Sequence, residues 1–454
     1  MSKQRIGLVV LTLVMVLALG AFVFAAGGGT AAAEEEMGQK QVAGKVLPSQ
    51  SQALRHAKGS LSEAVTSEGA KFIRLHFVDF DLAEGAVLTV SSPDGAQKFS
   101  YTGRGVNGNG DFWSFAIDGD AVNVDVQGQG SYRILDMGHG TIDLQSIPTP
   151  EIVVGTDGRE DIACHTGEAV VNAAQKPVAR LLFTVKRSQY LCTGELVRGS
   201  NANTLITNNH CFADQTATST LEARFNYQYT TCGGATLEAT TSYAGGTFLK
   251  TNAVKYSSRK PTTTGLDYTI VTLQGTPETT FGELIPTSAT YAVGTQMNFI
   301  QHPAGLPKKI GYWEDAEHTI RCKIDTINMT YGSSAPNSQA GYGCDSEGGS
   351  SGSAITRASD GKMIALHHYG GVTTVLNSGT MMALICTNAV GMGIDILSTN
   401  TFAISHVKEM ARKISIDTCK GIVSHIFEMK TASAIYEFMS KEIMENAHDI
   451  FELS

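Results

Sequence analysis

Residues 348–355 read GGSSGSAI, a pair of serines enclosed by glycines directly before an apolar run. Glycine adopts backbone angles that other residues avoid, so this stretch can turn successive N–H groups toward one point. The amides of Gly349 and Ser351 are then placed to stabilise an oxyanion, which is usually the largest single catalytic term. Because a Gly/Ser stretch is more often a loop or linker, this prediction needs partner residues elsewhere in the chain.

Two other segments carry the side chains that a serine nucleophile needs. The run LITNNHC ends at Cys211 and places His210 at the end of a strand-like stretch. The run CTGELV begins at Cys192, and a disulfide between Cys192 and Cys211 would hold His210 on a rigid loop, as a general base requires. The run GLDYTIVTL places Asp267 at the head of an apolar strand, where its carboxylate needs a donor such as an imidazole N–H.

Each segment is weak evidence when it is taken alone. A histidine beside a cysteine is more often structural than catalytic, and an aspartate before a strand is usually a turn residue. Together, however, His210, Asp267 and Ser351 follow one another in the order of a catalytic triad. The combination predicts a site in which Ser351 is the nucleophile, His210 the base and Asp267 the group that orients the base.

These three blocks resemble the histidine, aspartate and serine blocks of the trypsin/chymotrypsin superfamily of serine endopeptidases. The resemblance covers roughly residues 160–400, and within the superfamily it is greatest to the bacterial lysyl and glutamyl endopeptidase branch. It implies an all-β fold with a chymotrypsin-like double antiparallel β-barrel, and peptide hydrolysis through an acyl-enzyme on Ser351. It also implies an oxyanion hole formed by the amides of Gly349 and Ser351, without a metal or organic cofactor.

The chain contains eight cysteines, an even number that indicates disulfides in an exported protein. Metal binding is the alternative, but no CxxC pair or His/Cys cluster with ligand spacing occurs. The run FNYQYTTC resembles the lysyl enzymes, and this resemblance implies a disulfide between the amino-terminal segment and the first barrel. The remaining cysteines are paired by elimination. Either Cys386 or Cys419 can also stay free. The expected pairs beyond Cys192–Cys211 are Cys164–Cys232, Cys322–Cys344 and Cys386–Cys419.

The first residues of the chain have the pattern of a secretory signal. Lys3 and Arg5 precede an apolar run over residues 6–24, and small residues follow at 25–27. The alternative is an uncleaved membrane anchor, because the apolar run is nearly long enough to span a bilayer. We expect residues 1–26 to be removed, which gives a secreted protein, extracellular or periplasmic, without a stable membrane anchor.

Length and composition limit the classes of partner. A chain of 454 residues is long enough for two or three domains, and its 17% of charged residues and 48 glycines are typical of a β-rich, loop-rich protein. The net charge of −9 leaves no basic stripe for a phosphate backbone, so nucleic acid is not an expected partner. We expect protein or peptide substrates and a monomer.

Composition and periodicity divide the chain into five parts. An Ala-, Gly-, Glu- and Ser-rich stretch follows the signal, and short alternating runs between turn residues then predict strands. Near the end, apolar residues three and four apart predict helices. The expected parts are residues 1–26, signal peptide; 27–70, linker or propeptide; 71–150, a small β-sandwich that is a pro- or accessory domain; 151–400, the protease domain; and 401–454, a helical tail.

The residue before the predicted nucleophile is Ser350, whereas trypsin-like zymogens carry an aspartate that binds the new amino terminus on activation. Ser350 cannot form that ion pair, so the stretch Val153-Val154-Gly155 is not expected to act as an activated terminus. If the protein is a zymogen, we expect activation to mean removal of the amino-terminal β domain.

Two features predict different substrate preferences. Asp345 lies in the register of trypsin's pocket acid, and a carboxylate there would select Lys or Arg before the cleaved bond. Ser346 and the pair His367 and His368, shortly before Gly370, resemble the hydroxyl and imidazole of the glutamyl endopeptidases. The lysyl enzymes also carry a histidine before paired glycines, and Asp345 can equally be a turn residue. The sequence slightly favours basic substrates.

Two other functions remain open at this stage. The chain can be a catalytically silent, protease-like binding protein, or an adhesion or sugar-binding protein that acts through its amino-terminal β domain. Intact catalytic residue types argue against the first, and the helical tail allows a role in partner docking.

Overall fold

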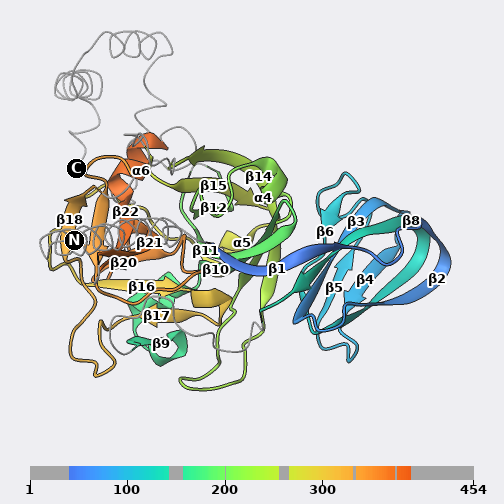
Figure 1. The fold of residues 1–454 in the computed structure, drawn as a ribbon, viewed down its shortest axis with the longest axis horizontal. Coiled ribbons are helices and arrows are strands. Elements are labelled where there is room, and N and C mark those ends of the chain that lie inside the picture. The colour runs from blue at the N-terminus through green and yellow to red at the C-terminus, as the bar shows by residue number, and fades with distance from the viewer. Residues whose placement is uncertain are drawn as a thin grey trace, which may run out of the picture. The chain divides into compact units, whose positions relative to one another are not determined.

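The computed structural model describes residues 40–142, 157–199, 201–254, 265–330, 334–373 and 376–389. The predicted signal peptide and helical tail lie outside these residues. The described part is dominated by strands, with four short α-helices (Figure 1), none of them long and apolar enough to cross a membrane. The helices are α3 (Ala169–Gln175), α4 (Gln215–Thr218), α5 (Pro277–Phe281) and α6 (Met382–Asn388), with 3-10 turns η1 (Ile162–Cys164) and η2 (Pro303–Gly305).

Six strands form a first, closed barrel. They are hydrogen-bonded in the order β10-β13-β14-β15-β12-β11, and pairing between β10 and β11 completes the circle. Strand β10 reads VARLLFTV and is buried on both faces, because Leu181 and Phe183 fill the barrel while Leu182 packs on the amino-terminal domain. The strands are β10 (Val178–Val185), β11 (Ser188–Leu196), β12 (Thr204–Thr207), β13 (Glu222–Phe225), β14 (Thr241–Asn252) and β15 (Tyr268–Leu273).

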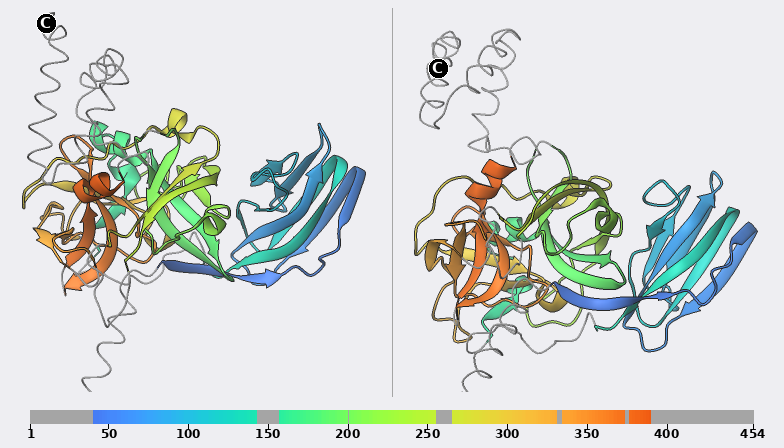
Figure 2. Two further views of the ribbon diagram at one scale, coloured as in Figure 1. Left: turned by 90° about the horizontal axis from the view of Figure 1, so that it is seen from above. Right: turned by 45° about the horizontal axis from the view of Figure 1, so that its top comes forward.

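Eight strands form a second, open barrel in the order β18-β19-β22-β21-β20-β16-β17-β9. The two barrels lie side by side (Figure 2). A shared apolar cluster joins them and includes Ile206 and Ile270 of the first barrel and Ile300 and Leu366 of the second. The predicted all-β, chymotrypsin-like double barrel is therefore confirmed. The strands are β9 (Arg159–Asp161), β16 (Met297–Gln301), β17 (Lys309–Gly311), β18 (Thr326–Met329), β19 (Gln339–Tyr342), β20 (Ala354–Arg357), β21 (Met363–Thr373) and β22 (Leu376–Met381).

The amino-terminal domain is built around the long strand β8, whose first half pairs with β2 and β4 and whose second half pairs with β3 and β1. Its apolar core contains Phe77, Phe80, Val124 and Tyr132. The strands are β1 (Gln41–Pro48), β2 (Arg55–Thr66), β3 (Phe72–Leu82), β4 (Val87–Ser91), β5 (Lys98–Tyr101), β6 (Phe112–Trp113), β7 (Ile117–Asp118) and β8 (Ala121–Gly140).

The domain begins earlier than its sequence predicts. Strands β1 and β2 lie within residues 27–70, which the sequence analysis assigns to a linker or propeptide. Strand β2 reads RHAKGSLSEAVT and only Ala57 in it is buried, so it lacks the apolar alternation that predicts a strand. Backbone pairing with β8 along its full length, and not side-chain burial, defines this edge strand.

The amino-terminal domain and the first barrel share a sheet and a buried cluster of charges. Strand β1 pairs with β8 of its own domain and with β11 of the barrel. The carboxylate of Glu222 is fully buried; it accepts from the Ala116 amide at 2.8 Å and forms an ion pair with Arg224 at 2.7 Å. Arg74 of β3 donates to the Thr220 carbonyl at 2.8 Å, and its charge helps to lower the pKa of Glu222 against the opposing effect of burial.

Replacing Glu222 with alanine should therefore destabilise the protein by about 3–5 kcal/mol, because the arginines Arg74 and Arg224 lose the charge that compensates their burial. The measurement is the free energy of unfolding in urea. The exposed variant Glu317→Ala is the control and should change that free energy by about 0.5 kcal/mol or less. Equal unfolding midpoints for the two variants would contradict a stabilising role for the buried cluster.

Strand β11 carries a second buried acid, Glu195, neither of whose carboxylate oxygens makes a hydrogen bond among the described residues. Burial raises the pKa of Glu195 well above its usual value, and the nearby Ala354 amide offsets this only in part. Above about pH 4.5 the unfolded chain releases this proton while the folded protein retains it, so stability falls by about 1.4 kcal/mol per pH unit until the folded-state pKa is passed.

Replacement of Glu195 with glutamine should remove this loss, because the amide cannot ionise. Urea unfolding at pH 5 and pH 8 measures the effect. We expect the wild-type protein to lose more stability than Glu195→Gln between these two values. If the wild-type protein lost the same free energy of unfolding as Glu195→Gln between pH 5 and pH 8, or less, Glu195 would be ionised in the folded state.

Candidate active site

His210 and Asp267 are brought together by the pairing of β12 with β15, in which Thr207 lies opposite Thr269. Asp267 is fully buried; its Oδ2 lies 2.7 Å from Nδ1 of His210, and its Oδ1 accepts from the His210 backbone amide at 2.9 Å. Both carboxylate oxygens thus hold the same residue. The arrangement fixes the orientation of the imidazole and places its Nε2 on the side away from Asp267.

Asp267 has a second imidazole neighbour. Nδ1 of His368 lies 3.2 Å from Oδ2 of Asp267, and Nε2 of His368 lies 2.5 Å from Oε1 of Gln339. Burial alone would raise the pKa of Asp267, but the hydrogen bonds and charges of His210 and His368 hold that pKa below its usual range. The carboxylate therefore remains ionised at neutral pH.

His367 and His368, which the sequence predicts to bind substrate together, have different partners in the structure. The register of β21 against β22 shifts between His367 and Tyr369, so the regular alternation of strand faces is interrupted here. His368 contacts Asp267 and Gln339, whereas Nδ1 of His367 lies 2.7 Å from the Tyr342 hydroxyl.

Ser351 lies at the turn before β20, next to the histidine loop. Its carbonyl accepts from the Thr193 amide at 2.9 Å and lies 4.0 Å from Sγ of Cys211, the residue after His210. Nε2 of His210 is buried and makes no hydrogen bond within the described part of the chain, with Ser351 or any other residue. In substrate-free enzymes this catalytic contact is often long and tightens when substrate binds.

The loop before Ser351 presents two unused amides. The Ala304 amide donates to the Gly348 carbonyl at 2.6 Å, so the N–H of Gly349, on the opposite side of the same planar peptide, points away from Ala304. Gly349 has φ = 95°, a left-handed conformation that favours glycine. Among the hydrogen bonds of the described residues, the amides of Gly349 and Ser351 donate none.

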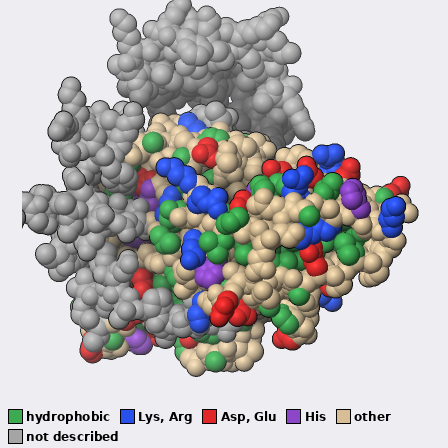
Figure 3. All heavy atoms as spheres, turned by 45° about the vertical axis from the view of Figure 1, so that its right-hand side comes forward, with side chains coloured by type: hydrophobic (Ala, Val, Ile, Leu, Met, Phe, Trp, Pro, Cys, Tyr) green, Lys and Arg blue, Asp and Glu red, His purple; other side chains and the backbone are tan. Residues whose placement is uncertain are grey.

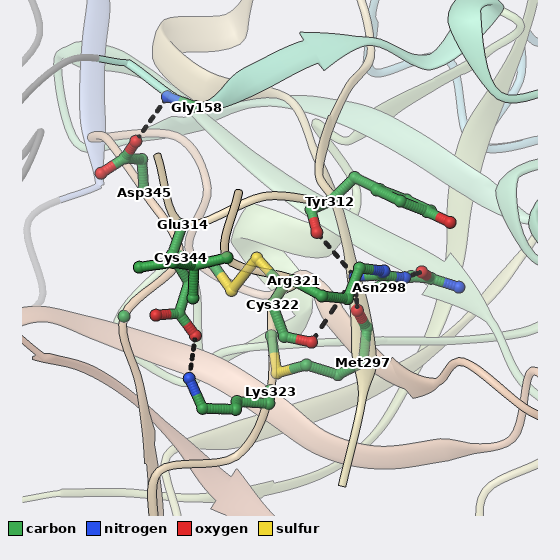
Figure 4. The surroundings of a disulfide bond; sticks show 12 residues. Gly158, Met297, Asn298, Tyr312, Glu314, Arg321, Cys322, Lys323, Cys344 and Asp345 are labelled. Atoms are coloured by element: carbon green, nitrogen blue, oxygen red, sulfur yellow. Dashed lines mark hydrogen bonds and ion pairs between the residues drawn. A yellow bond between two sulfur atoms is a disulfide. The ribbon is translucent and has the colours of Figure 1, made fainter. Parts of the chain in front are cut away.

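Three disulfides hold the site and its surroundings. Cys192–Cys211 joins β11 to the histidine loop, Cys164–Cys232 joins η1 to the first barrel, and Cys322–Cys344 lies in the second barrel just before Asp345 (Figure 4). These are three of the expected pairs. Cys386 of α6 is buried and forms no disulfide with a described residue; its expected partner, Cys419, lies outside the described residues.

The other residues assigned to substrate recognition differ in their surroundings. The carboxylate of Asp345 is buried and accepts from the Gly158 amide at 2.8 Å (Figure 4). Ser346 is buried beside it, and Gly370 lies partly exposed on β21. The Asp345 carboxylate thus accepts a hydrogen bond from the protein's own backbone, in the segment just before β9.

Several residues that position the site were not predicted from the sequence, namely Thr193, Gln301, Ala304 and Gln339. A polar glutamine at the end of the apolar run MNFIQ, followed by the turn HPAG, is the signal that could have drawn attention to Gln301. The contacts of these residues are with backbone carbonyls and side chains far away in the chain, and no local pattern predicts such contacts.

Comparison with known proteins gives a family for this part of the chain. Residues 156–380 match the family described as the C-terminal domain of lysyl endopeptidase. This region is therefore similar to a lysyl endopeptidase domain. The resemblance to chymotrypsin-like serine endopeptidases of the lysyl and glutamyl branch is thereby confirmed, on the segment that carries His210, Asp267 and Ser351.

The chain is also similar to a curated protein, Secreted RxLR effector protein 73 of Plasmopara viticola, with 28% identity over 69% of this chain and 79% of the relative. Two similar solved structures are a Glu endopeptidase in complex with MPD and an HtrA-type protease, AlgW, with a tripeptide. The first has 17% identity and a TM-score of 0.35, over 51% of this chain and 94% of that one. The second has 14% identity and a TM-score of 0.34, over 49% of this chain and 62% of that one.

The surface gives no indication of a polyanion-binding face on the side drawn in Figure 3. Basic and acidic side chains are scattered over the amino-terminal domain and the first barrel there, without a continuous patch of either sign. The match of residues 156–380 to a protease domain implies peptide substrates.

Proposed function

We propose that this protein is a secreted serine endopeptidase that uses Ser351, His210 and Asp267 as its catalytic triad. The observation that carries the proposal is the 2.7 Å contact between His210 Nδ1 and the buried carboxylate of Asp267, with the other imidazole nitrogen left unbonded. The unused amides of Gly349 and Ser351 add a site for negative charge. Secretion is supported by the charged and apolar pattern of residues 1–26 and by three disulfides.

The mechanism follows from the role of each group. His210 Nε2 takes the proton of the Ser351 hydroxyl as its oxygen attacks the carbonyl carbon of the peptide. Asp267 keeps the other imidazole nitrogen protonated and stabilises the positive charge that forms on His210. The amides of Gly349 and Ser351 donate to the developing oxyanion. His210 then protonates the leaving amine, and water activated by the same imidazole hydrolyses the acyl-enzyme.

For the residue before the cleaved bond, the contacts favour an acidic side chain over the basic one predicted from Asp345. The Asp345 carboxylate already accepts from Gly158, whereas the His367 ring has one hydrogen bond with the described residues, between Nδ1 and the Tyr342 hydroxyl. Burial, together with the neighbouring His368 and His210, lowers the pKa of His367 well below its usual value, so the ring is neutral at pH 7. With the Tyr342 hydroxyl donating to Nδ1, Nε2–H is a donor for a substrate carboxylate.

The test is cleavage of a diverse peptide mixture by the purified protein, read by mass spectrometry, with Ser351→Ala as the control. We expect cuts that are absent with the control and that follow glutamate more often than lysine or arginine. Cuts after lysine or arginine would return the selective role to Asp345. An absence of cuts would instead favour a catalytically silent, protease-like binding protein that acts through its amino-terminal domain.

A further inference from the structure

The loop over residues 345–350, which we call the oxyanion loop, precedes Ser351 and forms the site for the developing negative charge. In trypsin-like zymogens this loop is ordered by an ion pair between an aspartate and a newly cut amino terminus. The chain has Ser350 in place of that aspartate. In this chain the oxyanion loop is held by hydrogen bonds and an ion pair with other parts of the protein.

Gln301, the last residue of β16, contacts the oxyanion loop at both ends. Its Nε2 donates to the Asp345 carbonyl at 2.9 Å, and its Oε1 accepts from the Ser350 hydroxyl at 2.5 Å. The same Ser350 oxygen accepts from the Glu347 amide at 3.1 Å. Gln301 and Ser350 are both fully buried, so these neutral hydrogen bonds are shielded from competition with water.

The turn after Gln301 holds the middle of the loop. The Ala304 amide donates to the Gly348 carbonyl at 2.6 Å, and the Thr193 hydroxyl donates to the Gly349 carbonyl at 2.9 Å. Thr193 is in turn fixed by the His302 amide, which donates to its hydroxyl at 3.0 Å. The Gly348 carbonyl shares its peptide plane with the Gly349 amide. The Ser350 carbonyl, which accepts from the Ser353 amide at 3.1 Å, shares its plane with the Ser351 amide, so both amides are left free to face substrate.

The other side of the loop is held by an internal segment of the chain. The Gly158 amide donates to the Asp345 carboxylate, and Arg159 forms an ion pair with Glu347 at 3.1 Å between side chains that are 5% and 3% exposed. The Gly158 donor is a peptide N–H and the Arg159 donor is a side chain. Neither requires that the chain be cut before them.

We propose that the oxyanion hole is formed in the uncut chain, with Gln301 as its positioning residue, so that the protein is an active enzyme while its amino-terminal domain is still attached. This inference rests on the proposed serine endopeptidase function. It replaces the expectation that activation requires removal of the amino-terminal domain. The shared sheet between β1 and β11 and the buried Glu222 cluster are consistent with a domain that stays in place.

The first experiment labels the full-length protein with a fluorescent fluorophosphonate, which reacts with a serine activated by its base and oxyanion hole. Labelled bands are separated by size, so the uncut chain and a chain cut between residues 143 and 156 by an inserted cleavage site are measured in one sample. We expect second-order rate constants that agree within about twofold. Labelling of the cut chain alone would overturn this inference and leave the proposed function standing; labelling of neither would overturn the proposed function.

The second experiment tests the role of Gln301 with Gln301→Met, which keeps the volume of the side chain and removes both hydrogen bonds. We expect kcat to fall about 10- to 100-fold with little change in KM, less than the loss from removing an oxyanion donor outright. Gln296→Ala, on the exposed start of the same segment, is the control and should keep wild-type kcat. The positioning role would be contradicted if Gln301→Met had the kcat of the wild-type protein. It would also be contradicted if cutting the Gln301→Met chain between residues 143 and 156 restored kcat.

Discussion

Replacement of Ser351 with alanine should lower kcat for a cleaved peptide about 10⁶-fold, the size of loss expected when a serine nucleophile is removed from a working triad. The alanine leaves the amides of Gly349 and Ser351 in place, so residual hydrolysis of about 10³- to 10⁴-fold over water should remain. KM should change little, because within the described part of the chain the Ser351 hydroxyl makes no hydrogen bond that substrate binding has to break; only the Ser351 carbonyl is bonded there.

The measurement is steady-state hydrolysis of a peptide chosen from the cleavage mixture. Ser359→Ala serves as the matched control, since Ser359 is exposed on the turn between β20 and β21, at the opposite end of β20 from Ser351. Wild-type kcat in the Ser351→Ala protein would assign the hydrolysis to another residue or to a contaminant.

Replacement of Asp267 with asparagine should lower kcat about 10⁴-fold, less than the loss of the nucleophile. The carboxylate now accepts from Nδ1 of His210, which keeps Nε2 free to act as a base. An asparagine amide turned toward His210 donates to Nδ1 instead, which places the imidazole proton on Nε2 and blocks proton transfer from Ser351. His368 cannot substitute, because it contacts the same carboxylate oxygen and not Ser351.

The matched control for this variant is Asp360→Asn, which alters a surface carboxylate paired with Arg357 at 2.6 Å. We expect its kcat to stay within about twofold of wild type, because surface ion pairs contribute little. A loss of less than tenfold in Asp267→Asn would show that His210 does not need the carboxylate for its orientation.

The parts of the fold and site that could be predicted are those that carry a local signal. Residues LITNNHC and GLDYTIVTL each combine an apolar strand with a polar residue at its end, and the structure places His210 against Asp267 at the ends of paired strands. The strand-like runs and turn residues predict an all-β fold, which is confirmed.

The parts that could not be predicted depend on contacts between distant residues. Gln301 is 49 residues from Ser350 in the chain, and nothing near either residue indicates their hydrogen bond. His367 and His368 are adjacent in sequence, yet one contacts Tyr342 and the other Asp267, at a point where the register of β21 against β22 shifts. Strand β2 was not predicted because backbone pairing with β8 stabilises it, and such pairing does not require alternating apolar side chains.

The contacts of the amino-terminal domain indicate that it stabilises the first barrel. Its sequence allows a propeptide that is removed, but the buried Glu222, Arg224 and Arg74 join it to the first barrel. Removing the domain would expose these charges and the apolar residues Leu182 and Leu191, which pack with Phe72 and Ala116. We therefore expect the catalytic region to lose stability when it is expressed without residues 40–142.

The most direct test of the central claim is to detect the acyl-enzyme itself. The protein is mixed with an ester substrate that deacylates slowly, quenched with acid and digested, and the acylated residue is located by mass spectrometry. We predict one acyl group, on Ser351, in the wild-type protein and none in Ser351→Ala. Peptide hydrolysis without an acyl group on Ser351, or with the group on another residue, would contradict the account.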